Sequence, residues 1–180
     1  MIDMKRKVII FSLIVAVLIG IATTFTVIAI NSNKVDTEPE ESVNVKYDEN
    51  TEGVAFLNKD AKLSDIKRIK GVVNVYVFWG NGCPHCKALW EWLDSQREKY
   101  EGKVAVYGFE VFNSDKNRLI MDDFVDAVGD KDVNSVPYIV IGNKSIGGFT
   151  TGATTGKKIS ELIDSTKDSG KDIYFDKIKK

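Results

Sequence analysis

Residues 72–87 read VVNVYVFWGNGCPHCK, and this stretch decides the fold. Its first eight residues are β-branched or aromatic apart from one asparagine, which predicts a buried strand over 72–79. A glycine-containing loop follows, and two cysteines separated by Pro84 and His85 then open a helix predicted over 84–100. The apolar face of that helix is supplied by Cys86, Leu89, Trp90 and Leu93. A strand that leads directly into a helix is typical of α/β proteins.

Strand and helix patterns alternate outward from this stretch. Further strands are predicted at 54–57, 104–111, 137–141 and 144–149, and further helices at 63–70, 114–128 and 155–167. A tight-turn signal at 142–143 indicates that the last two strands pair as a hairpin, whereas the tail at 173–175 is ambiguous. The order β-α-β-α-β-α-β-β-α predicts an α/β fold with a central mixed sheet of four to five strands flanked by helices.

The N-terminal part of the chain has a different character. Residues 8–30 form an uncharged apolar run, which as a helix would be about 34 Å long and would cross a bilayer. Three basic residues at 5–7 precede this run and acidic residues follow it. Residues 1–7 are therefore expected in the cytoplasm, and the chain after residue 30 is expected outside the cell membrane. The run exceeds the apolar region of a cleavable signal peptide, so we predict a single-pass signal anchor. The polar, acidic residues 31–51 predict a flexible linker before a domain at 52–180.

The composition excludes several classes of function. With 25 basic and 26 acidic residues the net charge is −1, which lacks the basic excess of a nucleic-acid-binding protein. Two cysteines cannot form a four-thiolate zinc site and one histidine cannot complete a Cys₂His₂ site, so no metal is predicted. The only expected cofactor-like group is a redox-active disulfide between Cys83 and Cys86.

Cys83 and Cys86 are the candidate catalytic residues. Two cysteines at this spacing, where a buried strand meets a helix, are typical of a redox motif. Cys83 falls at the N-cap and Pro84 at the first helical position, so the Cys83 sulfur faces free N–H groups and the positive end of the helix dipole. These groups favour the thiolate, and His85 is expected to add a donor or positive charge nearby. Cys86 is expected to be buried and to resolve a mixed disulfide formed at Cys83.

Two alternatives to redox chemistry arise at the same residues. A purely stabilising disulfide is disfavoured, because closing a loop of about four residues gains only about 2 kcal/mol. Soft thiolates beside a histidine also suit Cu(I), although no third cysteine or second histidine exists to complete such a site.

Several motifs in order give the chain a family resemblance. Trp79 stands four residues before Cys83, Val136-Pro137 opens the strand at 137–141, and glycines occupy 147–148. With the two cysteines, these motifs make residues 54–167 resemble the thioredoxin superfamily. The Pro-His pair between the cysteines is similar to DsbA-type disulfide oxidants, and the stretch 136–148 also resembles glutaredoxins.

The resemblance implies a thioredoxin-like fold with a cis peptide before Pro137. It further implies that Val136, Pro137 and Gly147 bind the substrate chain, while Pro84, His85 and Trp79 tune the active site. The buried acid that thioredoxins often carry before the motif is replaced by Val77. Glu110 is an alternative proton relay for Cys86, but an exposed carboxylate at a strand end is the favoured interpretation.

These features together predict an extracytoplasmic thiol–disulfide oxidoreductase that oxidises thiols of secreted or membrane proteins and exchanges electrons with a membrane redox partner. Two alternatives share the cysteines: a disulfide reductase fed by a membrane electron donor, and a non-enzymatic Cu(I) thiol chaperone. A third alternative is a catalytically silent thioredoxin-like binding module.

Overall fold

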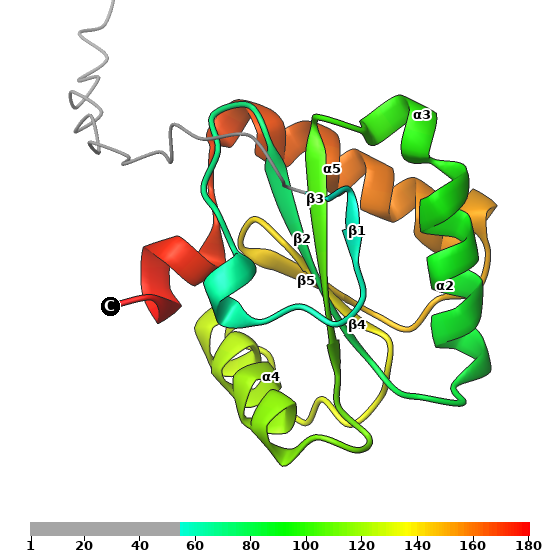
Figure 1. The fold of residues 1–180 in the computed structure, drawn as a ribbon, viewed down its shortest axis with the longest axis vertical. Coiled ribbons are helices and arrows are strands. Elements are labelled where there is room, and N and C mark those ends of the chain that lie inside the picture. The colour runs from blue at the N-terminus through cyan, green and yellow to red at the C-terminus, as the bar shows by residue number, and fades with distance from the viewer. Residues whose placement is uncertain (1–54) are drawn as a thin grey trace, which may run out of the picture. The chain divides into compact units, whose positions relative to one another are not determined.

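The computed structural model describes residues 55–180, and Figure 1 shows a central sheet between two layers of helices. The sheet has five strands in the order β1-β3-β2-β4-β5. The strands are β1 (Leu57–Asn58), β2 (Val73–Trp79), β3 (Val104–Glu110), β4 (Tyr138–Ile141) and β5 (Lys144–Gly147). The main helices are α2 (Pro84–Ser95), α3 (Arg97–Tyr100), α4 (Asp115–Val128) and α5 (Lys157–Ser169). The predicted α/β architecture with a mixed sheet is therefore confirmed.

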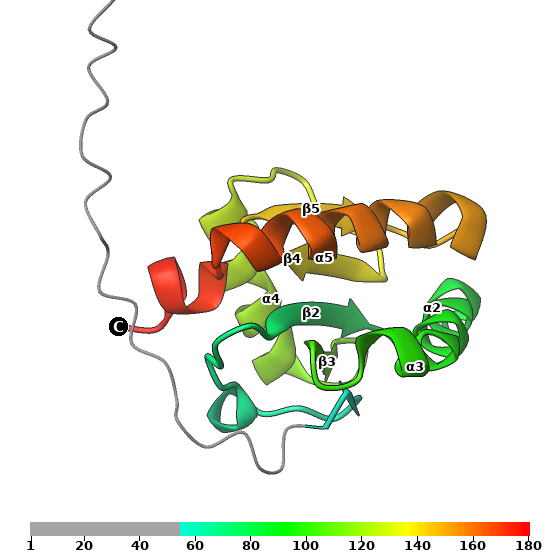
Figure 2. The same cartoon turned by 90° about the horizontal axis from the view of Figure 1, so that it is seen from above.

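Strand β2 occupies the centre of the sheet. It pairs in parallel with β3 and antiparallel with β4, and six of its seven residues are buried. The succession of β5, β4, β2 and β3 is visible in Figure 2. Parallel pairing places Trp79 opposite Glu110, so the carboxyl ends of β2 and β3 lie at the same edge. The loop that carries Cys83 starts at this edge.

Alternation along the strands divides the core between the two faces of the sheet, because successive side chains point to opposite sides. One face packs Val75 and Val77 against residues of α2, α3 and α5. The other face packs Tyr76 and Phe78 against α4 and the C-terminal turn. Figure 1 shows the same division, with α2 and α5 on one side of the sheet and α4 on the other.

The predicted helix at 63–70 is wrong. Only a single 3-10 turn, Leu63–Asp65, forms there, and the backbone is extended at Ile66, where the turn ends. The reason is non-local: Asn74 Nδ2 donates to the Lys67 carbonyl at 2.9 Å, and the Lys67 N–H donates to the Tyr107 hydroxyl at 3.3 Å. The Lys67 N–H and carbonyl thus form hydrogen bonds with side chains of the sheet, and these main-chain groups would otherwise form the hydrogen bonds of a helix.

Other predicted boundaries shift more modestly. The helix expected over 84–100 is divided at Gln96, where the Ser95 hydroxyl donates to the Trp92 carbonyl at 2.6 Å and the helix restarts as α3. The last helix starts at Lys157 after a π-helical turn at Gly152–Gly156. The edge strand expected at 54–57 is the two-residue β1, and the hairpin strand expected to reach 149 ends at Gly147.

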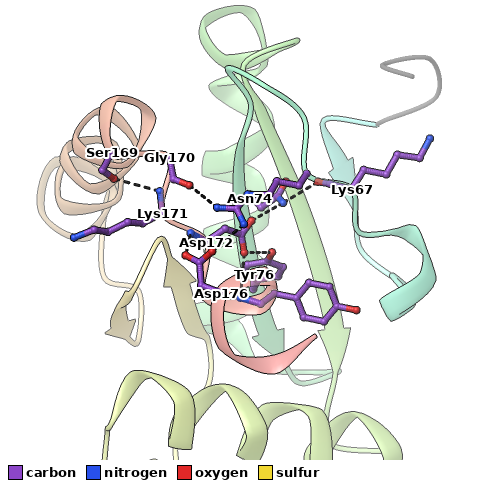
Figure 3. Close-up of polar contacts among 10 residues, drawn as sticks. Lys67, Asn74, Tyr76, Ser169, Gly170, Lys171, Asp172 and Asp176 are labelled. Carbon is purple, nitrogen blue, oxygen red and sulfur yellow. Dashed lines mark hydrogen bonds and ion pairs between the residues drawn. The ribbon is translucent and has the colours of Figure 1, made fainter. Parts of the chain in front are cut away.

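The C-terminal segment adds an element that the sequence left ambiguous. A π-helical turn, Tyr174–Ile178, follows α5 and packs against α4. Asp172 fastens it to the sheet, since its carboxylate accepts hydrogen bonds from Tyr76 at 2.7 Å and from Asn74 at 2.8 Å (Figure 3).

No helix within residues 55–180 is long and apolar enough to cross a membrane. The predicted cytoplasmic segment 1–7, signal anchor 8–30 and linker 31–51 lie outside the described residues and stay predictions.

Candidate functional site

The end of β2 and the start of α2 place Cys83. Three residues, Gly80 to Gly82, connect Trp79 to the helix, and Gly82 takes a φ of 80°, a conformation that favours glycine. Cys83 is the N-cap and Pro84 the first helical residue, as the sequence predicts. The Cys83 sulfur accepts a hydrogen bond from the Cys86 N–H at 3.2 Å, so the thiol itself caps the helix.

The two cysteines occupy different environments. Cys83 is half-buried, whereas the side chain of Cys86 is only 1% exposed. Burial and a hydrogen bond with Cys83 raise the pKa of the Cys86 thiol to about 12. One thiol is thus accessible to a partner and the other stays protonated inside the protein, which is the asymmetry that stepwise disulfide exchange requires.

The predicted substrate-binding residues lie beside Cys83. The Val136–Pro137 peptide is cis, as expected, and the Val136 carbonyl oxygen lies 3.8 Å from the Cys83 sulfur. Gly147 pairs with Tyr138 across the hairpin and is exposed, so its backbone is accessible beside the strand that follows the cis peptide. The structure brings Cys83, Val136 and Pro137 together, while their functional roles stay predictions.

His85 has a partner that the sequence did not indicate. Its Nδ1 lies 3.0 Å from the backbone carbonyl oxygen of Phe149, in the loop that follows β5. Because a carbonyl only accepts, Nδ1 carries the proton in this contact. Within residues 55–180, the Cys83 sulfur contacts the Val136 carbonyl, the Cys86 N–H and the Cys86 thiol. His85 therefore links α2 to the loop after β5, and a direct effect on Cys83 stays a prediction.

The sequence favoured Glu110 as an exposed carboxylate at a strand end, but in the structure its carboxylate is held by several hydrogen bonds. Its carboxylate accepts the N–H groups of Asn81 at 3.0 Å, Phe112 at 2.9 Å and Asn113 at 2.9 Å. Burial alone would raise its pKa, but these hydrogen bonds hold the pKa of Glu110 below its usual value. Glu110 joins the loop before Cys83 to the loop after β3, where the Phe112 ring lies against Gly80.

A groove of about 840 Å³ opens on the α2 side of the cysteines. Its apolar wall includes Trp79, whose Nε1 donates to the Lys59 carbonyl at 3.0 Å and whose ring meets Trp90 edge to face. The lining residues are Leu57, Lys59, Trp79, Gly80, Asn81, Gly82, Cys83, Pro84, Cys86, Lys87, Trp90, Glu91, Asp94 and Arg97. We call this surface the α2 groove. Sequence reasoning placed Trp79 at the site and Trp90 on the apolar face of the same helix as Cys86, but missed Lys59, which follows β1.

Metal-ligating side chains do not gather in the described part of the chain. Within residues 55–180, no group of three His, Cys, Asp or Glu side chains is placed to hold an ion. What the site offers chemically is a pair of thiols in unequal environments.

No family model matches the chain, and no curated protein is significantly similar to it. Among solved structures, the chain is similar to a protein from Agrobacterium tumefaciens at 22% identity, over 54% of this chain and 46% of that one, with a TM-score of 0.43. A thioredoxin-like protein from Clostridium perfringens shows 20% identity over 71% of this chain and 90% of that one, with a TM-score of 0.44.

A third solved structure is thioredoxin O1 from Arabidopsis thaliana in its oxidised state. It is 16% identical over 53% of this chain and 78% of that one, with a TM-score of 0.36. The chain thus spans less than half of the Agrobacterium protein and most of the other two. At these TM-scores the functional proposal rests on the geometry of the site.

Proposed function

We propose that this protein is a thiol–disulfide oxidoreductase in which Cys83 exchanges disulfides with a polypeptide and Cys86 resolves the product. The observation that carries the proposal is the pairing of an accessible N-cap thiol with a buried thiol of raised pKa, beside a cis peptide. Cys83 is the partly exposed thiol of the pair and sits at the N-cap of α2, and a thiolate is the form of a cysteine that attacks disulfides.

The exchange balances in two steps. In the reducing direction, the Cys83 thiolate attacks one sulfur of a substrate disulfide, forms a mixed disulfide and releases the first substrate thiolate. Cys86 then loses its proton and attacks the Cys83 sulfur, which forms the Cys83–Cys86 disulfide and releases the second substrate thiolate. Two electrons pass from the protein to the substrate, and the reverse sequence oxidises a substrate dithiol.

We further propose that the protein works as an oxidant outside the cell membrane. The Pro84-His85 pair, which is similar to that of DsbA-type oxidants, and the predicted anchor at 8–30 support this direction and place. Its substrates would be thiols of secreted or membrane proteins, and a membrane redox partner would restore the disulfide.

The deciding experiment is the reduction potential of the full chain, purified in detergent and equilibrated in graded thiol–disulfide buffers. We expect a midpoint of about −120 to −180 mV, the range of oxidants and isomerases. A midpoint near about −270 mV would instead indicate a reductase fed by a membrane electron donor. The absence of any reversible two-electron transition would contradict the proposal. Copper binding that resists a strong chelator would then favour the Cu(I) chaperone.

A trapping experiment tests the assignment of the two thiols. Cys86→Ser should accumulate mixed disulfides with substrate proteins through Cys83, because the resolving thiol is gone. Cys83→Ser is the matched control and should accumulate none. If Cys83→Ser also leaves the cellular phenotype intact, the protein is a silent binding module.

A further inference from the structure

The α2 groove is a second surface that touches Cys83. Its lining includes both cysteines but none of Val136, Pro137 and Gly147, so it lies apart from the cis-proline side of the site. Along α2 it extends from Pro84 to Arg97, just beyond the end of that helix. At 1.5 Å per residue this span is about 20 Å, which matches about six residues of an extended chain. The length of the groove fits a polypeptide segment better than a small molecule.

The floor of the groove contains a polar group that lacks a partner. Trp90 is 5% exposed, and its indole nitrogen has no hydrogen-bond partner within residues 55–180. A buried donor left unpaired is unfavourable, and native structures seldom leave one unsatisfied. Because this nitrogen is itself buried, the ring of Trp90, and not its N–H, is the part that lines the groove for a bound chain.

The charges of the groove are unbalanced. Two of its cations are paired along the helix: Lys87 lies 3.8 Å from Glu91, and Arg97 lies 3.0 Å from Asp94. The third cation, Lys59, forms no ion pair within residues 55–180, and its ammonium group lies 5.4 Å from the centroid of the Trp90 ring. Lys59 is exposed, so its ammonium group is accessible to a carboxylate of a bound chain, with the modest, salt-sensitive attraction of a surface ion pair.

We propose that the α2 groove binds an extended segment of the substrate polypeptide whose acidic side chain pairs with Lys59. This inference rests on the proposed function, because it names the class of substrate that Cys83 meets: chains with an acidic residue within about six positions of the reacting cysteine. Cys83 lies at one end of the groove, so the bound segment would present its own sulfur there.

The test compares peptides that differ in one charge. Each peptide carries one cysteine, blocked as a mixed disulfide with 2-mercaptoethanol, and has Glu, Gln or Lys at the same position within six residues of it. The reduced full chain, in detergent, is mixed with each peptide, and the second-order rate constant of exchange is measured from tryptophan fluorescence. We expect the Glu peptide to react about five-fold faster than the Lys peptide at about 20 mM salt, and the preference to disappear near about 500 mM.

Variants locate the source of the preference. Lys59→Gln should reduce the Glu/Lys ratio of rate constants to near unity, and Lys59→Glu should invert it. Only the backbone carbonyl of Lys59 bonds to Trp79, so these side-chain changes preserve that contact. Lys158→Gln, an exposed lysine on α5 outside the groove, is the matched control and should keep the wild-type ratio.

The outcomes distinguish a failure of the acidic-substrate preference from a failure of the oxidoreductase function. Equal rate constants for the three peptides, or a preference that survives in Lys59→Gln, would overturn the acidic-substrate inference and leave the oxidoreductase standing. No exchange with any peptide or with a small aromatic disulfide would remove the proposed function itself.

Discussion

At the residue scale, the contrast between the two thiols makes a direct prediction about their reactivity. Burial and its contact with Cys83 raise the pKa of Cys86 to about 12, so its thiol stays almost entirely protonated near pH 8. Brief alkylation of the reduced chain with iodoacetamide should therefore modify Cys83 alone, as read by peptide mass spectrometry. In guanidinium both thiols should react. Equal labelling of both cysteines in the folded protein would contradict the assignment.

Glu110 carries a second residue-scale prediction. Glu110→Ala frees the N–H groups of Asn81, Phe112 and Asn113, and should lower the free energy of unfolding by about 1–2 kcal/mol, because water can reach part of this loop. Glu110→Gln keeps one acceptor oxygen and should lose less. Urea unfolding measures both variants.

The pH dependence of stability shows whether the negative charge of Glu110 contributes, or only its ability to accept hydrogen bonds. A pKa held below the usual value means that the folded state favours the charged form. Its stabilisation is present above the ordinary glutamate pKa of about 4.3 and is lost as pH falls through the lower folded value. The stability gap between wild type and Glu110→Gln should therefore shrink in acid, and a gap independent of pH would show that the charge is irrelevant.

At the element scale, Gly108 in β3 lets two parts of the groove, the Trp90 ring and the backbone of Lys59, pack closely against the strand. A Cβ built there would lie 2.8 Å from the Trp90 ring and 2.7 Å from the Lys59 carbonyl. Alanine usually stabilises a strand relative to glycine, but here it should cost about 1–3 kcal/mol through overpacking and should shift the tryptophan fluorescence. Gly147→Ala in β5 is the control, since no atom lies within 4 Å of its added Cβ. Equal stabilities of the two variants would mean that Trp90 moves freely.

The elements that the sequence predicted well are those specified by local pattern. The strand leading to Trp79 and the helix starting at Pro84 follow from periodicity and capping, and both form close to the expected residues. The helix expected at 63–70 has the right apolar spacing but fails, because the hydrogen bonds of Lys67 with Asn74 and Tyr107 depend on the assembled sheet. Such competition is invisible in a local window of sequence.

The residues of the candidate site also fall into those that short motifs predicted and those that only the fold brings together. Cys83, Cys86 and the cis Pro137 follow from short motifs, and the structure brings Cys83 and Pro137 to the same place although they are distant in sequence. The contacts of Glu110 with Asn81, and of Lys59 with the Trp90 ring, join segments that carry no shared motif. The parallel pairing of β3 with β2 on one side and with β1 on the other brings these segments together, so the groove could not be predicted without the fold.

At the scale of the whole molecule, the C-terminal segment is held to the sheet by one buried carboxylate. Asp172 is 7% exposed and accepts hydrogen bonds from Tyr76 and Asn74 (Figure 3). It also accepts one from the Tyr174 N–H. Close by, Arg68 pairs with Asp176 at 2.8 Å and donates to the Gly170 carbonyl. These contacts close the face of the sheet that α4 also covers.

Replacing Asp172 should therefore loosen the end of the molecule. Asp172→Ala removes the acceptor of the Tyr76 hydroxyl, on a fully buried side chain, and one of the two acceptors of the Asn74 amide, and should cost about 2–4 kcal/mol. Asp172→Asn retains one acceptor and removes the charge. Thermal unfolding followed by near-UV circular dichroism measures the loss, and native-state hydrogen exchange should show it concentrated around residues 170–178.

The same carboxylate should make stability fall as pH rises. Burial raises the pKa of Asp172, although the hydrogen bonds from Tyr76 and Asn74 partly oppose the shift. A folded pKa above the unfolded one means that the folded state holds the proton more tightly. The resulting stabilisation is fully present below the ordinary aspartate pKa of about 3.9 and is lost as pH rises through the folded value. Wild type should therefore lose stability relative to Asp172→Asn between about pH 3 and neutrality. A difference that grows with pH instead would mean that the hydrogen bonds to the charged form outweigh its desolvation.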